Sequence, residues 1–439
     1  MATTRSTLIA GLLPLLVAVP VGAQSPPRSP ASRPSSAPAS APTSRPTEAP
    51  ASRPAPAADP DLAELEAALA ADGRSRSDGD DADRDPRGGW VQTAVRTFQS
   101  LNPEISFIAD VALAWFTSED PLMSGAHDPR ETGFTLQQLE LAVSAAVDPY
   151  FRFNANVVFS EFGVEIEEVY ATTLSLPWNL QLRAGQFLTR FGRINNTHPH
   201  TWKFVDQPLV MGKFFGGENN RGVGVEASVL LPLPWYVLLL GSATDAAGAS
   251  TTRSFFGSDD LGVEDPGDFQ YTVAAKQFFP LGDDLSLAWG LSAALGPNST
   301  GRDNRSEIFA TDLYLKYRPI SRGSYTVVSL ELEWMLRRRQ VPADVLQDHG
   351  MYTQLFYRFT RRWAAAARYE YVSGTAADYL DPLWTGTRHR ASGNITFWPT
   401  EFSRLRLQYN HDRPSWRDGY HGVMTSFEFA VGAHGAHTF

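Results

Sequence analysis

The feature that most constrains this chain is a two-residue alternation of apolar and polar side chains, which begins near residue 104 and recurs to the C-terminus. In YFRFNANVVFS at 150–160, every second residue is aromatic or aliphatic, and an arginine and two asparagines occupy positions between them. SRLRLQYN at 403–410 repeats the split. Successive side chains of a β-strand point to opposite faces. The alternation therefore predicts a sheet with one apolar and one strongly polar face.

About 16 such segments follow one another, and short connections alternate with longer ones. Tight turns at one end and longer loops at the other are typical of an up-and-down barrel in the outer membrane. We therefore predict an all-β, transmembrane antiparallel up-and-down β-barrel of about 16 strands. The alternation is unclear at 164–176 and 235–244. The predicted strands are 104–116, 135–147, 150–160, 164–176, 179–189, 220–231, 235–244, 268–279, 284–295, 306–318, 324–337, 350–360, 362–373, 387–398, 402–411 and 421–439. The predicted long connections are 117–133, 189–219, 245–267, 296–305, 338–349 and 374–386.

Three segments are predicted to precede the barrel, which we assign to 104–439. Residues 1–23 hold one arginine, an apolar run and small residues, the pattern of a secretory signal peptide. Residues 24–60 are rich in Pro, Ala and Ser and predict a disordered linker, for which periplasmic or cell-wall contact is an alternative role. Residues 61–103 predict a short helical and acidic periplasmic segment. The terminal Phe439 on an alternating strand resembles the insertion signal of outer-membrane barrels.

Composition narrows the function further. The chain has no cysteine, which excludes disulfides and cysteine-ligated metal. The chain has no run of about 18 consecutive apolar residues, so a membrane-spanning helix is not predicted. The formal net charge of -10 argues against a nucleic-acid partner. An enzyme is not expected, because Ser403 and His411 lie on one predicted strand and no phosphate loop or metalloprotease motif is present.

The polar face of such a barrel would surround its lumen, because basic residues facing lipid at the bilayer midplane cost about 2 to 4 kcal/mol. Arginines on the twelfth to fifteenth strands would then form a patch on one wall, which would favour anions. The alternative is that they pair with acids to hold the wall. A barrel of this size normally leaves an aqueous channel. The predicted pore-lining residues are Arg152, Arg183, Arg358, Arg368, Arg388, Arg390, Arg404, Arg406, Lys276, Lys316, Asp110, Glu140, Glu331 and Glu333.

The longest connection, at 189–219, contains RFGRINNTHPHTWKFVDQPLV. If it folds inward, it narrows the pore. Zinc takes three or four N or O ligands, and His198, His200 and Asp206 offer three. The alternative is that the two histidines hydrogen-bond the loop to the wall. The predicted constriction residues are Arg190, Arg193, Asn195, His198, His200, Lys203 and Asp206.

The segments GVEIEEVY at 163–170, GQFLTRFGRIN at 185–195 and HPHTWKFVDQPL at 198–209 resemble a family of bacterial outer-membrane proteins labelled zinc-regulated outer-membrane receptor. That family is distantly similar to phosphate-selective porins. The label implies an energised receptor, which needs about 22 strands and a plug. Residues 104–439 are too few for both. Family members often carry a His-rich first outer loop, and here that loop holds His127 alone.

The leading functional prediction is a porin-like channel in the bacterial outer membrane for passive diffusion of small solutes, with anions favoured. One alternative is an uptake protein linked to zinc or another metal, with the 190–218 region as its capture site. A second is a plugged structural barrel tethered in the periplasm. Outer-membrane lipid and small solutes or ions are the expected partners, and a homotrimer is expected by analogy with porins. No cofactor is predicted apart from zinc in the first alternative.

Overall fold

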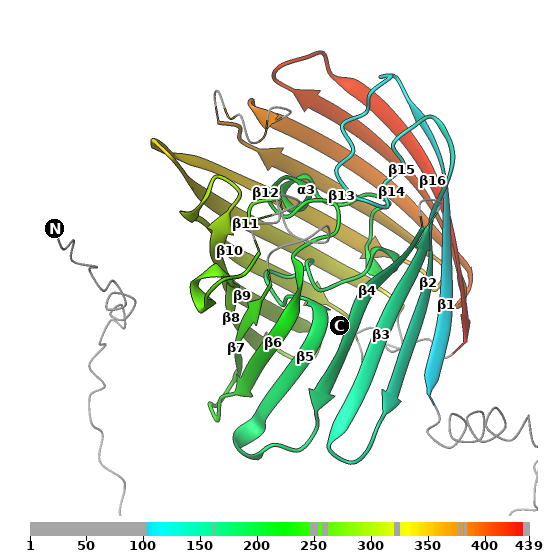
Figure 1. Ribbon diagram of the computed structural model, residues 1–439. Coiled ribbons are helices and arrows are strands. Elements are labelled where there is room, and N and C mark those ends of the chain that lie inside the picture. The colour runs from blue at the N-terminus through cyan, green and yellow to red at the C-terminus, as the bar shows by residue number, and fades with distance from the viewer. Residues whose placement is uncertain are drawn as a thin grey trace, which may run out of the picture. The chain divides into compact units, whose positions relative to one another are not determined.

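The computed structural model describes residues 103–432, apart from 161–162, 246–252, 257–261, 320–324, 376–377, 379–380 and 382–383. The predicted signal peptide, linker, acidic segment and terminal Phe439 lie outside the described residues. Sixteen described strands form one closed antiparallel sheet in which each strand pairs with its neighbours in sequence and β1 pairs with β16 (Figure 1). The all-β barrel prediction is therefore confirmed.

The strands agree with the predicted segments to within a few residues, except that β10 and β12 begin earlier than predicted. No helix among the described residues has the length and apolar character to cross a bilayer. One short α-helix, α3 (Leu209–Phe214), and the 3-10 turn η2 (Pro199–Thr201) lie between β5 and β6. The strands are β1 (Glu104–Phe116), β2 (Gly133–Ala146), β3 (Phe151–Ser160), β4 (Gly163–Thr173), β5 (Leu180–Leu188), β6 (Arg221–Leu230), β7 (Tyr236–Thr244), β8 (Gln270–Pro280), β9 (Leu285–Asn298), β10 (Gly301–Tyr317), β11 (Val327–Val341), β12 (Asp344–Arg358), β13 (Trp363–Val372), β14 (Arg388–Thr400), β15 (Ser403–Pro414) and β16 (Tyr420–Gly432).

The two faces of the wall differ as the alternation predicts. On β15, Arg406 is 2% exposed and Leu407 is 52% exposed. The arginine points into the barrel, where its guanidinium donates to the carbonyl of Phe204. Large aromatic side chains are exposed at the short-turn end, where they form a belt typical of a membrane interface. Members of this belt include Tyr150, Trp178, Tyr357 and Trp363.

Two of the predicted long loops are wrong. Residues 296–305 and 338–349 belong mostly to the β9–β10 and β11–β12 hairpins, which extend the ladder to a tight turn. Their sequences are polar, which obscures the alternation. A hairpin that stands above the bilayer in water needs no apolar face, so polarity there does not exclude strand. The last predicted strand, 421–439, is described only to Gly432.

The two segments with unclear alternation have separate physical reasons. The register of β3 with β4 shifts so that Asn156 faces Glu168 and Val157 faces Ile166, which leaves Glu167 as the extra residue of a β-bulge. Both neighbouring glutamates are therefore buried inside the wall. On β7 the wall is apolar on both faces, because Leu238 lines the interior cavity and Leu239 is exposed outside.

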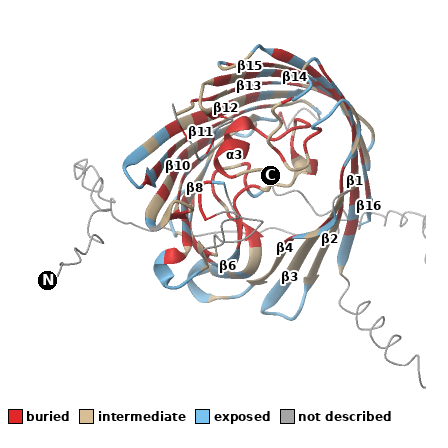
Figure 2. Cartoon of the chain, turned by 45° about the horizontal axis from the view of Figure 1, so that its top comes forward, coloured by how far each residue is buried: buried red, intermediate tan, exposed pale blue. Residues whose placement is uncertain are grey.

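The connection between β5 and β6, residues 189–220, folds into the barrel, and we call it the inward loop (Figure 2). It turns inward at Gly192, whose φ of 55° is in the left-handed region and whose added Cβ would lie 1.7 Å from Glu333 Oε1. Helix α3 of this loop contacts β12 and β13. The barrel interior consequently holds an apolar core formed by Phe191, Ile194, Trp202, Leu209, Val210, Met211, Phe214, Phe215, Phe255, Ala294, Ile308, Ala310, Met335, Tyr352, Val372 and Trp384.

Candidate functional site

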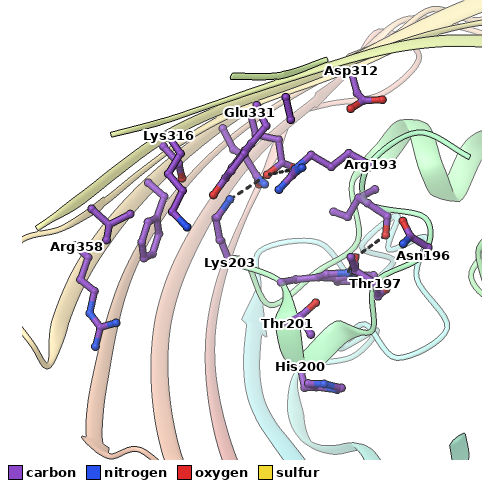
Figure 3. A pocket seen from close by; sticks show the side chains of 18 of the residues that line it. Arg193, Asn196, Thr197, His200, Thr201, Lys203, Asp312, Lys316, Glu331 and Arg358 are labelled. Atoms are coloured by element: carbon purple, nitrogen blue, oxygen red, sulfur yellow. Dashed lines mark hydrogen bonds and ion pairs between the residues drawn. The ribbon is translucent and has the colours of Figure 1, made fainter. Parts of the chain in front are cut away.

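A cavity of about 1090 Å³ lies inside the barrel between the inward loop and the wall (Figure 3). Its wall includes residues near the short turns, such as Arg358, Trp398 and Phe402, so it occupies the half of the lumen next to those turns. Eight of its lining residues are lysine or arginine, and four are acidic. The basic residues are Arg190, Arg193, Lys203, Lys276, Lys316, Arg318, Arg358 and Arg404. The acidic residues are Asp312, Glu331, Glu401 and Glu428.

Part of this basic lining is fixed by ion pairs that join the inward loop to β11. Lys203 Nζ lies 2.9 Å from Glu331 Oε2, and Arg193 Nε lies 3.8 Å from the same oxygen. The Arg193 guanidinium also lies 3.6 Å from the ring centroid of Tyr314. The loop therefore holds two cations at the cavity surface beside a shared carboxylate and an aromatic ring.

Arg358 has a different environment. Its guanidinium donates to the backbone carbonyls of Thr360 and Arg361 and lies 4.8 Å from the ring centroid of Trp398. Among the described residues it forms no ion pair with a carboxylate. Lys316 and Arg318 line the same cavity. This part of the cavity wall therefore carries three basic residues.

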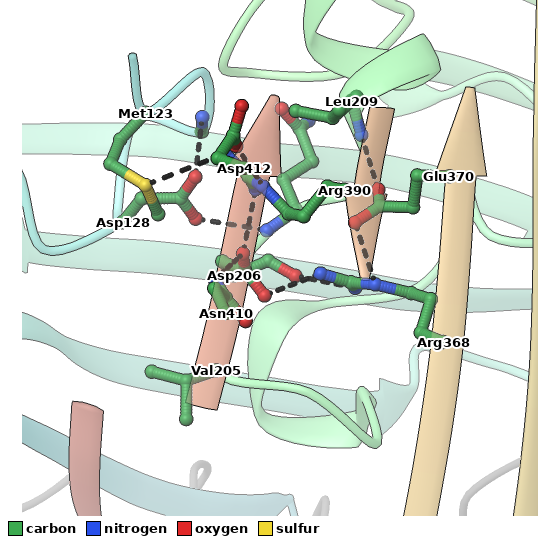
Figure 4. Close-up of polar contacts among 12 residues, drawn as sticks. Met123, Asp128, Val205, Asp206, Leu209, Arg368, Glu370, Arg390, Asn410 and Asp412 are labelled. Atoms are coloured by element: carbon green, nitrogen blue, oxygen red, sulfur yellow. Dashed lines mark hydrogen bonds and ion pairs between the residues drawn. The ribbon is translucent and has the colours of Figure 1, made fainter. Parts of the chain in front are cut away.

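A second group of charges lies beneath the inward loop and is shut away from water. Asp206 of the loop accepts from Arg368 at 2.5 Å and from Arg390 at 2.8 Å (Figure 4). Gln408 and Asn410 donate to the same carboxylate at 2.6 and 2.9 Å. Burial raises the pKa of Asp206, but the two arginines outweigh it and the pKa is lowered. Asp206 thus anchors the loop to β13, β14 and β15.

Asp128, in the connection between β1 and β2, lies beside this anchor. Its carboxylate accepts from the backbone N–H groups of Gln207 and Gly125 at 2.9 and 2.8 Å. Burial and the neighbouring Asp206 carboxylate raise the pKa of Asp128 to about 6. The first outer connection and the inward loop are therefore packed together through an acid that is costly to ionise.

The third group surrounds the two histidines of the inward loop. His198 Nδ1 lies 2.9 Å from Glu167 Oε2, and His198 Nε2 lies 3.0 Å from Glu168 Oε2. His200 Nδ1 lies 2.8 Å from Glu140 Oε2. Burial lowers the pKa of His198, but the carboxylates of Glu167 and Glu140 outweigh it and hold the pKa well above its usual value. The histidines thus tie η2 to β2 and β4.

Comparison with known proteins places this chain in a family. No protein-family model matches the sequence. An uncharacterized protein of Aquifex aeolicus is 31% identical over 404 residues, which cover 80% of this chain and 83% of that protein. The chain belongs to the same family as the Aquifex protein. Nothing in these comparisons bears on the label of zinc-regulated receptor, which stays a prediction from sequence for this family member.

Solved structures share the fold of this member of the Aquifex family. OprB of Pseudomonas putida has a TM-score of 0.54 at 10% identity, over 78% of this chain and 97% of that chain. The outer-membrane channel DcaP of Acinetobacter baumannii has a TM-score of 0.53 at 12% identity, over 75% and 97%. An anion-selective porin of Comamonas acidovorans has a TM-score of 0.50 at 9% identity, over 75% and 99%. The fold is therefore that of outer-membrane porins and channels.

The predicted site residues divide among these environments. Of the predicted pore-lining residues, the cavity is lined by Lys276, Lys316, Glu331, Arg358 and Arg404. Arg152 lies at a short turn, where it pairs with Glu104 at 3.2 Å, and Arg183 pairs with Glu226 at 3.0 Å. The others face inward but are buried beneath the inward loop or, for Arg388, against the connection between β1 and β2, so they do not contact an open lumen as predicted. These are Asp110, Glu140, Glu333, Arg368, Arg388, Arg390 and Arg406.

The constriction candidates are likewise split. Arg190, Arg193, His200 and Lys203 line the cavity. Asn195 instead joins the two ends of the loop, because its side-chain amide donates to the carbonyls of Thr189 and Asn220 at 2.7 and 3.0 Å.

The structure does not bring together the three residues predicted as metal ligands: of these, only His198 belongs to a group of potential ligand atoms in the described part of the chain. Two groups of three or more His and acidic ligand atoms lie within 4.8 Å of one another in the described part of the chain, and neither contains Asp206. Arg368 and Arg390 hold Asp206 at the β13–β15 wall instead, which the spacing of the sequence does not show.

Several site residues were missed by the sequence reasoning. Glu167 and Glu168 face the histidines, Asp128 holds two backbone N–H groups, and Asp312 pairs with Lys276 at 3.2 Å. The signal for the glutamates was present, because a doublet of acids in a strand with broken alternation marks a β-bulge that turns both side chains inward. Nothing in the sequence marks Asp128, since its role depends on a contact with residue 207.

Proposed function

We propose that the protein is a porin-like channel of the bacterial outer membrane, through which small solutes diffuse passively and anions are preferred. The observation that carries the proposal is the excess of eight basic over four acidic residues around the lumen cavity. A cavity lined by one sign of charge, between low-dielectric walls, concentrates ions of the opposite sign. The fold shared with outer-membrane porins and channels supports the location and the passive mechanism.

The anion preference is assigned to a different wall from the one that the sequence indicated. Arg368, Arg388, Arg390 and Arg406 are ion-paired and buried, so their charges are largely neutralised. Lys316, Arg318 and Arg358, on the wall of β10 and β12, take over this role because they line the cavity. A homotrimer, a periplasmic role for the linker and the lack of enzymatic activity stay predictions.

The test is single-channel conductance with reversal potential in a KCl gradient, on purified protein in planar bilayers. We expect anion-selective conductance in the wild type. The double variant Lys316→Gln/Arg358→Gln removes two charges from the cavity and should lower the anion-to-cation permeability ratio about twofold or more. The matched control is Arg338→Gln/Arg413→Gln, which removes two charges from exposed positions.

Each outcome separates the alternatives. An unchanged permeability ratio in the cavity variant, or an equal fall in the control, would overturn the assignment of anion preference to this wall. No conductance at all in the wild type would favour the second candidate, a plugged structural barrel. That candidate is supported by the apolar core that the inward loop builds inside the barrel.

A further inference from the structure

The histidine cluster of the inward loop has the composition of a metal site. His198 precedes η2, Glu140 lies on β2, and Glu167 and Glu168 lie on β4. All four side chains are buried or nearly so, with exposed fractions of 13% for His198, 0% for Glu140, 6% for Glu167 and 10% for Glu168. Three separate segments of the chain therefore deliver one imidazole and three carboxylates to one point inside the barrel.

The distances fit one ion between three of these groups. Ligand atoms of His198, Glu140 and Glu167 all lie within 4.8 Å of one another. His198 Nδ1 is 2.9 Å from Glu167 Oε2 and 3.9 Å from Glu140 Oε1. Ligand atoms around tetrahedral zinc, with bonds of about 2.0 to 2.2 Å, are about 3.4 Å apart. Both distances from His198 Nδ1 lie within about 0.5 Å of that spacing.

The remaining contacts supply the support that metal-bound histidines usually have. When Nδ1 binds an ion, the Nε2–H group of His198 can donate to Glu168 Oε2, 3.0 Å away. A ligating histidine nearly always donates its other ring N–H to a carboxylate or carbonyl, which fixes the ring. The second oxygen of Glu140 is held by His200 Nδ1 at 2.8 Å. The site therefore has an outer shell as well as ligands.

The negative charge of the cluster also favours a bound cation. Some buried acids elsewhere in the barrel pair with an arginine, as Asp110 does with Arg406 and Asp412 does with Arg388. Among the described residues, none of the three cluster glutamates forms an ion pair with lysine or arginine; their ion-pair partners are His198 and His200. Three buried carboxylates against two imidazoles, with His127 beside Glu167, leave net negative charge whenever the rings are neutral. An unbalanced buried charge is costly.

The local fold concentrates this charge rather than avoiding it. The β-bulge at Glu167 turns two consecutive glutamates inward where a regular strand would present one. Gln138, on β2 and two residues from Glu140, is fully buried and its side-chain amide has no hydrogen-bond partner among the described residues. A second group, His127, Glu167 and Glu218, shares Glu167 with the first. This side of the lumen is thus polar, acidic and under-compensated.

We propose that the cluster binds one divalent transition-metal ion of the zinc type, with His198 Nδ1, Glu140 and Glu167 as ligands and Glu168 orienting His198. Imidazole together with carboxylate suits zinc, whereas magnesium and calcium favour all-oxygen sites. The ion would join η2 to β2 and β4 and so fix the inward loop. Its ligand set differs from the one that sequence spacing suggested, since His200 and Asp206 are replaced by two glutamates of the wall.

Binding is tested directly, on the full chain without a histidine tag, folded in detergent and stripped with EDTA. Isothermal titration with ZnCl₂ and elemental analysis of the washed protein should give one tightly held Zn²⁺ per chain. His198→Ala and Glu167→Gln should each weaken binding by at least about 100-fold, and Glu168→Gln by about 10-fold. The matched control is His389→Ala, whose ring packs against Tyr371 away from the cluster. MgCl₂ serves as the comparison ion and should not bind tightly.

The possible outcomes either support the site or remove it. No tight Zn²⁺ binding by the folded wild type would overturn the proposal, as would equal affinity in His198→Ala and His389→Ala. Loss of binding in His127→Ala but not in His198→Ala would place the ion in the other group and also overturn it. Glu167→Gln is nearly isosteric, so it carries the test if His198→Ala fails to fold. The experiment measures no conduction, so its result is independent of the proposed channel function.

Discussion

At the scale of single residues, the inward loop is held by acids whose ionisation the barrel interior controls in opposite ways. Two arginines lower the pKa of Asp206, so its ion pairs contribute stability above the ordinary carboxyl pKa and lose it only as pH falls through the lowered value. Among the described residues, Asp128 forms no such ion pair, and its carboxylate accepts from backbone N–H groups instead. The burial of Asp128 beside Asp206 raises its pKa to about 6. Near neutral pH its ionised form therefore lowers the stability of the packed loop.

This contrast predicts that mild acid tightens the loop. The folded-state pKa of Asp128 lies above its unfolded value, so the associated stability is fully present below about pH 4 and is lost as pH rises through about 6. A shift of this size corresponds to at most about 3 kcal/mol. The wild type should therefore gain thermal stability in detergent between pH 7.5 and pH 5. Asp128→Asn should show a smaller gain over the same interval, and identical pH dependence in the two proteins would contradict the prediction.

At the scale of structural elements, the strands could be predicted and the loop packing could not. Alternation predicts the bounds of β3 and β15 to within a few residues. It does so because one face of each strand meets lipid and the other faces the barrel interior. The extended part of the β9–β10 hairpin was not predicted as strand, because that constraint ends where the strands leave the bilayer. Helix α3 was not predicted, because Leu209–Phe214 is too short to show a helical period and its burial depends on contacts with β12 and β13.

One glycine tests how closely α3 is fitted to the wall. A Cβ added to Gly350 on β12 would lie 2.8 Å from both Val210 Cγ2 of α3 and Val372 Cγ1 of β13. Gly350→Ala should therefore displace α3 and lower the stability of the packed loop by about 1 to 3 kcal/mol. The control is Gly393→Ala on β14, where an added Cβ meets nothing within 4 Å. Limited proteolysis of the loop and thermal unfolding should distinguish the two variants, and equal behaviour would contradict the fit.

At the scale of the whole molecule, the barrel interior consists of two regions. The wall of β13–β15 and the inward loop form a packed region of apolar side chains and neutralised ion pairs. The wall near the short turns leaves a cavity with excess positive charge. The barrel itself is a closed ladder of backbone hydrogen bonds that does not include the inward loop. The inward loop can therefore narrow the lumen of the barrel without being needed to close its wall.

Shortening the loop tests that separation. The loop ends are already joined, because Asn195 Oδ1 accepts from the backbone N–H of Asn220 at 2.7 Å and the backbone N–H of Thr189 donates to the Asn220 carbonyl at 2.9 Å. A short Gly-Ser connection can therefore replace residues 196–218 while keeping both ends of the ladder. Removing the packed region should raise single-channel conductance at least about twofold, because a 16-stranded barrel leaves an aqueous channel when nothing fills it.

The result depends on where the resistance of the pathway lies. If the loop is the narrowest part, conductance rises, and anion preference persists because Lys316, Arg318 and Arg358 remain on the wall. If conductance is unchanged in a variant that still inserts and still shows a heat-resistant barrel on electrophoresis, the restriction lies elsewhere and the loop is a structural filling. A variant that conducts more but loses its anion preference would show that Lys203, which the shortening removes, sets selectivity rather than the wall.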